Sequence, residues 1–500
     1  MTVRWSRRTI LRGAGLMAAG AALAPAATFA AERSSVIVVG AGLSGLGAAL
    51  MLQDAGVDVT VLEGSARIGG RVWTADGVEG RPEYGASQVG RSYSRVIAMI
   101  ERLGLKLIPE KRDVLPSAML FRDRWFKPGE WEASPLNSMT GDERKLTPNL
   151  VGNLLLDRYN RLKEIDDWLK PEFADLDVGV ADLLRKHGHS AQAIEFATRQ
   201  GGSSGPFATS VLALFQDSTR NRFDTRFGRP EGAAEAQRAV YGFRNDRTEL
   251  INGLAMISNI EGGTSRLTEA MARTLAKPVL TGKTVYEIDM TGPKAVVRTM
   301  DGASYQADRV IYTGPFSTLR RVVVRPMLEG AQAQAVTDLS VGQTTRAFVM
   351  IRKPYWEEDG LPPSFFTDGP IQQLWAIDNM GEGSIWRGMV VMTGANALRI
   401  DMIPPADMPR YVISEIEKAR PSTNGKIDFL TWLSWENVPL IRACRHLYAP
   451  GQVTRFADAM IKPWGKLHVA GEHTRRLDVG MEAAMESGER AAMEVLDALG

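Results

Sequence analysis

The stretch Ser35-Val-Ile-Val-Val-Gly40-Ala-Gly-Leu-Ser-Gly45 decides the fold of this chain. A short β-branched run leads into a Gly-x-Gly-x-x-Gly turn, and an apolar, helix-like stretch follows over residues 46–55. A second β-like run over residues 57–62 ends at Glu63. The glycine pattern alone is weak evidence, but a strand, a glycine turn, a helix, a second strand and an acid in this order are typical of a dinucleotide-binding βαβ unit.

The three glycines and the acid each have a physical task in such a unit. Gly40 permits the tight turn, Gly42 lets the backbone approach a pyrophosphate, and Gly45 lets the helix pack closely on the strand. The helix N-terminus offers free N–H groups and a positive dipole to the phosphates. Glu63 is placed to accept hydrogen bonds from ribose hydroxyls, which favours FAD or NAD over NADP. The alternative is a glycine-rich turn in an unrelated α/β protein.

The composition is that of a soluble globular protein. The 500 residues are 44% hydrophobic and 24% charged, which excludes a disordered or collagen-like chain and leaves room for roughly two to four domain-sized units. The single cysteine excludes a disulfide framework within the chain and any cysteine-based zinc or iron–sulfur site. His187-Gly188-His189 has no set of acids and histidines around it, so we interpret it as a solvated loop and expect no metal site.

Residues 1–30 are predicted to be a targeting segment. Four of the 60 basic residues and none of the 58 acids lie there, so the rest of the chain is close to neutral and gives no reason to expect nucleic-acid binding. Residues 6–12, Ser-Arg-Arg-Thr-Ile-Leu-Arg, precede a mildly apolar run rich in Gly and Ala, which matches a twin-arginine export signal.

This signal predicts a location in the periplasm. The apolar run of about 18 residues is short and weakly apolar for a membrane span. We therefore expect the signal to be cleaved and the mature protein to have no membrane segment; the alternative is an anchor that is never cleaved. Twin-arginine export carries folded proteins, which suits a chain that acquires its cofactor before it leaves the cytoplasm.

Two further glycine-rich segments carry a resemblance to a known family. Arg67-Ile-Gly-Gly-Arg-Val72 resembles the GG-R-x motif of the flavin-dependent amine oxidases, the superfamily of monoamine and polyamine oxidases, and Glu83-Tyr-Gly-Ala-Ser-Gln-Val-Gly90 resembles a second segment of that family. The resemblance implies FAD as the cofactor. Gly70, with the glycine before it, would let the chain pass the flavin's phosphates, and Arg71 would neutralise charge. The alternative for Arg71 is an ordinary surface arginine.

The resemblance continues to the C-terminal end. The segments that carry it are 261–267, 284–288, 307–311, 467–474 and 481–491. It implies that Val285 contacts adenine through its backbone and that Gly471 and Glu472 belong to the second flavin-binding strand. The helix that starts near Gly480 and Met481 would point its N-terminus at the N1/O2 edge of the flavin. The resemblance thus runs from about residue 34 to residue 499, dense at the FAD motifs and thin between them, and together with the signal it implies a bacterial, twin-arginine-exported amine oxidase.

The expected fold class is α/β, with a Rossmann-type FAD-binding domain and a discontinuous, mixed α+β substrate-binding domain like that of the amine oxidases. The FAD-binding domain is predicted to comprise residues 33–91, 250–325 and 455–500, and the substrate-binding domain residues 92–249 and 326–454. Helices are expected over residues 151–169, 178–186 and 191–199, a loop over 201–206, and strands over 346–351 and 388–393.

Three positions at the reacting end depart from the family's pattern. The family usually has a lysine where this chain has Arg346, and aromatic residues where it has Arg445 and Gly480. The aromatic pair that aligns a simple amine is therefore expected to be absent, and the two arginines are candidates to receive a carboxylate or another polar group of the substrate. The alternative is that both arginines pair with acids of this protein. Gln88 stands where related amino-acid oxidases tend to have an arginine, which argues against a standard α-amino-acid oxidase.

Cys444, the only cysteine, directly precedes Arg445. Monoamine oxidases attach their flavin through a cysteine at this place, so Cys444 is a candidate for covalent attachment. The alternative is a small buried side chain. The candidate reaction site is completed by Arg346 and Gly480.

The function that the resemblance implies is oxidation of a small-molecule amine. Hydride transfer from the carbon beside the nitrogen to flavin N5 gives an imine, and then a carbonyl compound with ammonia or a smaller amine. Oxygen or a periplasmic electron carrier would be the acceptor. Two alternatives stay open: an FAD-dependent desaturase or isomerase that acts on C–C bonds, which the missing lysine and aromatic pair favour, and a flavin-binding protein without turnover.

Overall fold

The computed structural model describes residues 33–109, 117–127, 129–199, 208–226, 250–251, 254–255, 257–378 and 386–500. The predicted export signal and the predicted loop at 201–206 lie outside the described residues. Ser34–Gly500 form one compact unit. Within the ranges above, no helix is both long and apolar enough to cross a bilayer.

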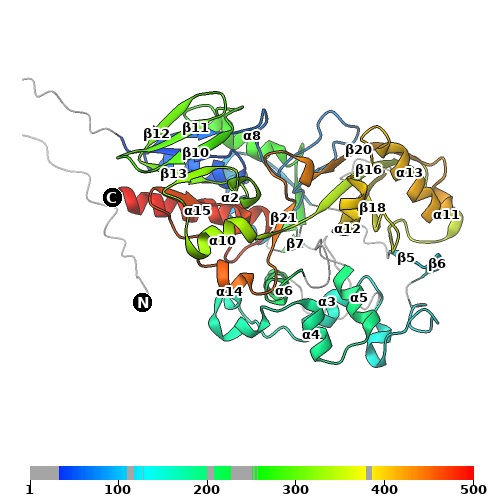
Figure 1. Cartoon of the computed structure of the whole chain (residues 1–500). Coiled ribbons are helices and arrows are strands. Elements are labelled where there is room, and N and C mark those ends of the chain that lie inside the picture. Colours follow the sequence, from blue (N-terminus) through cyan, green and yellow to red (C-terminus); the bar gives the residue numbers. More distant parts are fainter. Residues whose placement is uncertain are drawn as a thin grey trace, which may run out of the picture. The chain divides into compact units, whose positions relative to one another are not determined.

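One parallel sheet contains strands from both the N-terminal and the C-terminal part of the described chain (Figure 1). Its strands, in spatial order, are β2 (Asp58–Leu62), β1 (Ser35–Val39), β13 (Arg309–Tyr312) and β22 (Leu467–Val469). All three neighbouring pairs are parallel. Parallel strands need crossover connections, so the sheet collects segments that are far apart in the sequence. The parallel sheet agrees with the Rossmann-type FAD-binding domain that the glycine turn predicts.

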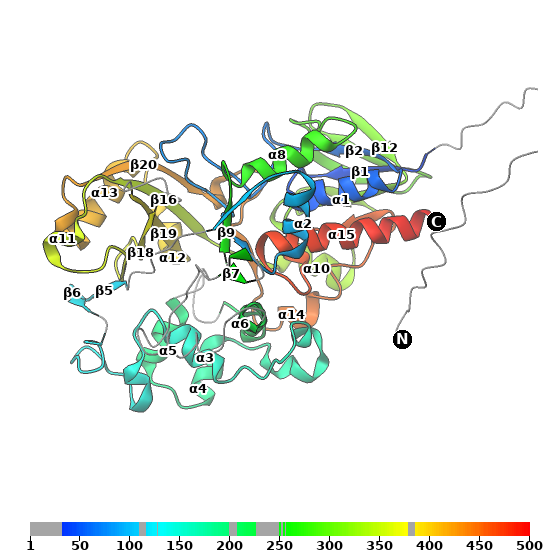
Figure 2. The ribbon, with the colours of Figure 1, turned by 180° about the vertical axis from the view of Figure 1, so that it is seen from behind.

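Two helices cover one face of this sheet. Helix α1 (Leu43–Asp54) and helix α15 (Gly480–Leu499) lie side by side (Figure 2) and share a core with Val36 and Val38 of β1. The approach is close, because a Cβ on Gly488 would lie 2.3 Å from the main-chain oxygen of Ser44. The close contact at Gly488 thus brings the middle of α15 to the start of α1, beside the glycine turn.

A second four-stranded sheet packs against the opposite face. It consists of β12 (Ser304–Ala307), β11 (Ala295–Thr299), β10 (Val285–Asp289) and β14 (Val323–Arg325). Ile288 and Val297 of this sheet share a core with Ile37 and Val310 of the parallel sheet. The strands of the two sheets come from residues assigned to the predicted FAD-binding domain.

The strands of a seven-stranded sheet come from residues assigned to the predicted substrate-binding domain. Its order is β20 (Ile427–Ser434), β16 (Thr344–Ile351), β19 (Trp386–Thr393), β18 (Gln373–Asp378), β17 (Phe365–Thr367), β5 (Ala118–Phe121) and β6 (Arg124–Phe126). The two strands expected over residues 346–351 and 388–393 are β16 and β19, which pair in antiparallel fashion. The division of the chain into two discontinuous domains stays a prediction.

The helix expected over residues 151–169 is wrong in its length. Helix α3 ends at Asp157, and a short 3-10 helix covers Asp167–Leu169. Between them the side chain of Asn160 accepts a hydrogen bond from Leu162 N. Asp167 Oδ2 accepts bonds from the amides of residues 163 and 164, which precede it, at 2.8 and 2.9 Å. Side chains that accept hydrogen bonds from nearby main-chain N–H groups in this way compete with the hydrogen bonds of a helix.

The remaining described elements complete the framework. The helices are α2 (Ser94–Arg102), α4 (Val180–Lys186), α5 (Ala191–Arg199), α6 (Val211–Arg226), α8 (Ser265–Thr274), α9 (Phe316–Leu319), α10 (Gly330–Asp338), α11 (Trp356–Asp359), α12 (Ala395–Ile400), α13 (Met408–Ala419) and α14 (Gln452–Phe456). The strands are β3 (Val89–Gly90), β4 (Leu107–Pro109), β7 (Leu250–Ile251), β8 (Leu254–Ala255), β9 (Ile257–Ile260), β15 (Ser340–Gly342) and β21 (Arg445–Leu447).

Residues 187–189 form a loop between α4 and α5, as expected, but only the first of its two histidines is solvated. His187 is exposed and stacks on the ring of Tyr159. The side chain of His189 is only 9% exposed; its Nδ1 contacts Glu143, and its Nε2 lies 2.6 Å from the Tyr159 hydroxyl. His189 is therefore half-buried, with its ring held by Glu143 and Tyr159. Among the described residues, no group of three or more His, Cys, Asp or Glu side chains is arranged to hold a metal ion.

Candidate active site

A cavity of about 1150 Å³ lies at the carboxyl ends of the parallel strands. Gly40 after β1, Glu63 after β2, Thr313 after β13 and Gly471 after β22 all line it. This edge of an open parallel sheet is where such folds bind ligands. The predicted site residues that line the cavity are Gly40, Gly42, Glu63, Gly70, Arg71, Val285, Arg346, Cys444, Arg445, Gly471, Glu472, Gly480 and Met481.

The glycine turn leaves no room for a side chain at two of its three glycines. Gly40 has a φ of +108°, and a Cβ there would lie 2.4 Å from Thr313 Oγ1. A Cβ on Gly45 would lie 1.9 Å from the main-chain oxygen of Gly40. Gly45, the one predicted site residue outside the cavity lining, therefore acts by letting α1 pack closely on the turn.

Gly42 and Gly70 border an open cradle. A Cβ on Gly42 would meet its nearest neighbour, the Cα of Gly70, only at 3.9 Å. Gly42 is also the N-cap of α1, and no side chain caps this helix, so the N–H groups of its first turn lack a side-chain partner. Unpaired N–H groups at a helix N-terminus, in front of an open cradle, fit the pyrophosphate of a dinucleotide.

Glu63 holds the turn from the neighbouring strand. Its Oε2 accepts a hydrogen bond from Ala41 N at 2.8 Å, and its Oε1 accepts bonds from Ser65 N and Oγ at 2.8 and 2.9 Å. A carboxylate oxygen has more than one acceptor position, so these bonds orient Glu63 and still leave it able to receive a hydroxyl. This arrangement fits the predicted contact with a ribose.

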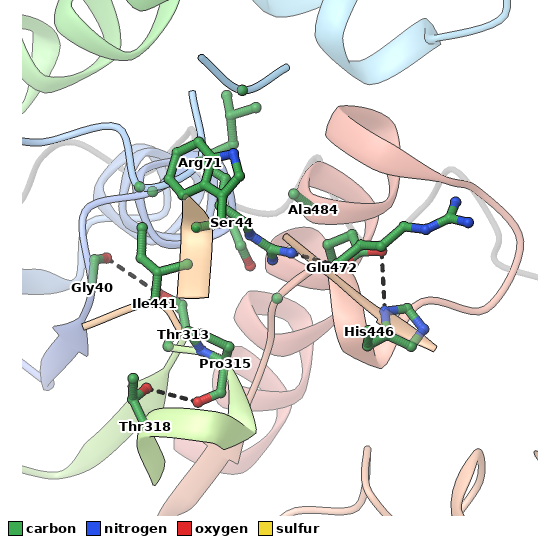
Figure 3. A pocket seen from close by; sticks show the side chains of 18 of the residues that line it. Gly40, Ser44, Arg71, Thr313, Pro315, Thr318, Ile441, His446, Glu472 and Ala484 are labelled. Carbon is green, nitrogen blue, oxygen red and sulfur yellow. Dashed lines mark hydrogen bonds and ion pairs between the residues drawn. The ribbon is translucent and has the colours of Figure 1, made fainter. Parts of the chain in front are cut away.

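The side chains of Arg71, Glu472 and His446 meet at the cavity wall (Figure 3). Arg71 Nη1 donates to Glu472 Oε2 at 3.0 Å and to the carbonyl oxygen of Cys444 at 3.0 Å. His446 Nδ1 lies 3.1 Å from Glu472 Oε1. Burial alone would raise the pKa of Glu472, but His446 and Arg71 outweigh it and hold that pKa well below its usual range. Arg71 is thus fixed by a buried carboxylate and is no ordinary surface arginine.

A buried ion pair extends this charged cluster. Arg475 is 6% exposed, and its Nη1 donates to Asp217 Oδ1 at 2.5 Å. Asp217 lies on α6 and lines the cavity beside Arg475. Burial works against the charge of Arg475, but Asp217 and Glu472 overcome it and raise the pKa of the guanidinium. Carboxylates and guanidinium groups therefore alternate along the wall from α6 to Arg71.

Arg346 lies at the cavity wall and is held by main-chain oxygens. Its Nη1 donates to the carbonyl of Gly85 at 2.6 Å and, more weakly, to those of Tyr84 and Glu83 at 3.3 and 3.5 Å. No acid of the described residues pairs with Arg346. Arg445 is exposed, lines the same cavity, and lies on β21 opposite Gly342 of β15.

Aromatic side chains do line the cavity, but they come from other positions than the two at which the family has them. Those two positions hold Arg445 and Gly480. Gly480 has a φ of +58°, and a Cβ there would lie 3.2 Å from the hydroxyl oxygen of Tyr93. Tyr93 directly precedes α2 and lines the cavity, as do Trp435 and Tyr448. Tyr93 was not predicted from the sequence, because its contact with Gly480 joins segments far apart in the chain.

Helix α6 and the residues just before it also line the cavity, which was not predicted from the sequence. Thr209, Ala213, Asp217 and Asn221 all line the cavity. Their regular spacing of four residues is a signal that could have been found, because it puts side chains on one face of a helix. Helical spacing alone does not tell which face meets a cavity and which meets the core.

The fold and the cavity define an α/β protein of the dinucleotide-binding class. A family model described as flavin containing amine oxidoreductase matches residues 43–496, and the chain therefore belongs to this family. It is a flavin-dependent amine oxidase whose cofactor is FAD.

Individual relatives are distant in sequence and similar over nearly the whole length. A flavin-containing amine oxidase of Danio rerio is 24% identical over 490 residues, which cover 94% of this chain and 87% of the relative. The solved structure of a putrescine oxidase bound to putrescine matches with a TM-score of 0.72 at 20% identity, over 93% of this chain and 99% of that one. Cyclohexylamine oxidase from Brevibacterium oxydans matches with the same TM-score, identity and coverage.

Proposed function

We propose that this protein oxidises the C–N bond of an amine to an imine, which then gives a carbonyl compound with ammonia or a smaller amine. The observation that carries the proposal is one continuous cavity. It runs from the glycine cradle at Gly42 and Gly70 to a wall with Arg346, Trp435 and Arg445. The cofactor and a substrate can therefore lie in contact within it.

The chemistry divides between the cofactor and the chain. FAD, when bound, accepts a hydride at N5 from the carbon next to the amine nitrogen. Gly42 and Gly70 would make room for its pyrophosphate, and Glu63 would accept hydrogen bonds from its ribose hydroxyls. Glu472 holds the guanidinium of Arg71 in one position, so that its positive charge faces the cavity without a reorganisation cost. Oxygen or a periplasmic electron carrier would take the electrons.

The experiment that tests this proposal is an anaerobic panel of amines with the FAD-loaded protein. Bleaching of the flavin absorbance by an amine, followed by release of ammonia or a smaller amine, supports amine oxidation. Bleaching without release of a nitrogen compound would instead favour a desaturase or isomerase acting on C–C bonds. The absence of bleaching by any substrate would favour a flavin-binding protein without turnover.

For the substrate, we propose that Arg445 and Arg346 recognise a carboxylate or another polar acceptor. Arg346 still has Nη2 and Nε outside the three carbonyl contacts made by Nη1, and Nε is buried without a hydrogen-bond partner in the described structure. A buried guanidinium N–H without a partner is costly, which favours an acceptor on the ligand. Arg445 lies on the same wall of the cavity.

Arg445→Leu is expected to weaken binding of acidic amines by about 1.5 kcal/mol, the lower end for a hydrogen bond to a charged group because Arg445 is exposed. The measurement is flavin reduction at varied substrate concentration, with amines that carry a carboxylate and with their neutral amides as matched controls. The loss should appear for the acids alone. Equal losses for both kinds would assign Arg445 a structural role.

We further propose that the twin-arginine segment exports the folded protein to the periplasm. Replacement of Arg7 and Arg8 by lysine is expected to leave the protein in the cytoplasm with FAD still bound, because the transport route reads the arginine pair and the folded body is unchanged. Cell fractionation followed by the flavin spectrum of each fraction measures this. Unchanged arrival in the periplasm would contradict the assignment of the signal.

A further inference from the structure

Side chains of α6 hold the segment that leads into α15, and the reaction described above does not use them. Gln216 Nε2 donates to the carbonyl oxygen of Leu477 at 2.8 Å. Arg220 Nε donates to Asp478 Oδ1 at 2.8 Å, and its Nη2 lies 2.7 Å from the same oxygen. Gly480, the first residue of α15, follows two positions later and lines the cavity. Helix α6 therefore fixes the path of the chain toward the end of α15 that faces the cavity.

Both oxygens of the Asp478 carboxylate are bound by arginines. Arg220 binds Oδ1, and Arg95 Nη1 donates to Oδ2 at 3.3 Å. Arg220 and Asp478 are buried, so water and salt screen their attraction only weakly. The guanidinium is also held from its other side, because Nη2 donates to Ser92 Oγ at 3.0 Å. The carboxylate of Asp478 therefore has one fixed place.

Without these arginines, the carboxylate of Asp478 would be drawn to a different place. An acid just before a helix is attracted to the positive end of the helix dipole and can accept hydrogen bonds from the N–H groups of the first turn. In α15 no side chain caps this end. Gly480 and Met481 line the cavity there. The positive end of α15 is thus left to whatever occupies the cavity.

A second acid at this helix end is bound to another element. Glu482 lies in the first turn of α15 and is fully buried. Its carboxylate accepts hydrogen bonds from the main-chain N–H groups of Arg95 and Val96, at 2.9 and 3.0 Å, and so caps the start of α2. Glu482 is therefore held mainly by the main chain, whereas the place and the charge of Asp478 depend on Arg220.

We propose that Arg220 is a positioning residue for the cofactor: it keeps the carboxylate of Asp478 off the N-terminus of α15 and balances its charge. Reduction adds negative charge to a flavin ring, and a positive helix end that lines the cofactor cavity favours the reduced state. Arg220 therefore makes the flavin easier to reduce, although it does not line the cavity itself. The inference depends on FAD as the cofactor and not on the compound that reduces it.

The test is the midpoint potential of the flavin in the FAD-loaded, full-length protein, measured by reductive titration against a reference dye without any substrate. Arg220→Met releases the carboxylate of Asp478, and the potential is expected to fall by about 30 mV, a tenfold change in the equilibrium of a two-electron couple. Asp478→Asn leaves a positive charge without its partner and should raise the potential. In the double variant Arg220→Met/Asp478→Asn both charges are absent, and the potential should return close to that of wild type.

Arg420→Met is the matched control for the loss of a buried ion pair. Arg420 is 1% exposed and donates to Asp359 through two hydrogen bonds of 2.8 Å, and neither residue lines the cavity. Its replacement should lower the free energy of unfolding and leave the flavin potential unchanged. Arg220→Lys keeps the positive charge with fewer hydrogen bonds, so its potential should stay close to that of wild type.

Opposite shifts in the two single variants, cancelled in the double variant, would support the role of Arg220. An unchanged potential in Arg220→Met, or shifts of both single variants in one direction, would overturn the proposal and leave Arg220 a structural anchor. If Arg220→Met does not fold, an Asp478→Asn potential that fails to rise overturns it. A protein that shows the expected shifts and is bleached by no amine would keep this role and contradict the proposed amine oxidation.

Discussion

Gly42→Val is expected to give a folded protein that has lost its FAD. The backbone of Gly42 has φ −81° and ψ 178°, a conformation that valine adopts readily. The nearest atom to its new Cβ would be the Cα of Gly70 at 3.9 Å, so the protein itself is not in conflict with the side chain. The two methyl groups would instead fill the cradle in which the pyrophosphate must lie against the main chain.

The expected weakening of FAD binding is about 100-fold or more, or about 3 kcal/mol. It is measured as the ratio of flavin to protein absorbance after purification and by titration of the apoprotein with FAD, while circular dichroism verifies the fold. Gly77→Val is the matched control, because a Cβ on Gly77 meets no atom within 4 Å and Gly77 does not line the cavity. A Gly42→Val protein with full FAD occupancy would disprove the assignment of the cradle.

The parts of the fold that could be predicted from the sequence are those whose conformation depends on residues close together in the chain. The strand at Ser35–Val39 agrees to the residue, and α1 and β2 differ from the expected ranges by only a few residues. The reason is local: buried parallel strands need β-branched runs, and the contacts of Gly40 and Gly45 arise within or beside one short turn. Family resemblance then extended this local inference to the rest of the parallel sheet.

The substrate side of the cavity could be predicted only in part. Arg346 and Arg445 were found as departures from a family pattern, and both line the cavity. The partners of Arg346 are main-chain oxygens of residues 83–85, and main-chain acceptors carry no signature in the sequence. Tyr93 and Asp217 meet the cavity through contacts with Gly480 and Arg475, which lie hundreds of positions away. Such pairs depend on the packing of whole helices.

His473 illustrates a property that follows from burial and could not be inferred from the sequence. Its side chain lies within the fold at 2% exposure, and its ring packs edge-on against Phe316 with the centroids 4.4 Å apart. Neither ring nitrogen has a hydrogen-bond partner in the described structure. Burial, with smaller contributions from His446 and Arg71, lowers the pKa of His473 to about 3. The ring is therefore neutral at neutral pH in the folded protein.

His473 is expected to make the folded protein sensitive to acid between pH 7 and pH 5. In the unfolded chain its pKa returns to about 6.5, so below that pH the unfolded state binds a proton that the folded state does not. The free energy of unfolding therefore decreases as the pH falls through this window. Each pH unit below the unfolded pKa costs about 1.4 kcal/mol, which gives a loss of about 2 kcal/mol at pH 5 from this one side chain.

His473→Leu should remove this part of the acid sensitivity, because leucine fills a similar apolar space and takes up no proton. The measurement is urea unfolding of the FAD-loaded protein at pH 7 and pH 5, and wild type should lose about 2 kcal/mol more than the variant between them. Burial raises the pKa of Glu83 and Glu482, which makes the free energy of unfolding increase as the pH falls. This effect is equal in both proteins, so it cancels in the comparison.

Exposed His187→Gln serves as the control and should lose as much free energy of unfolding as wild type. Equal losses in wild type and His473→Leu would mean that the folded protein protonates this ring in the same pH range as the unfolded chain, and that the ring has access to water or an acceptor despite its burial.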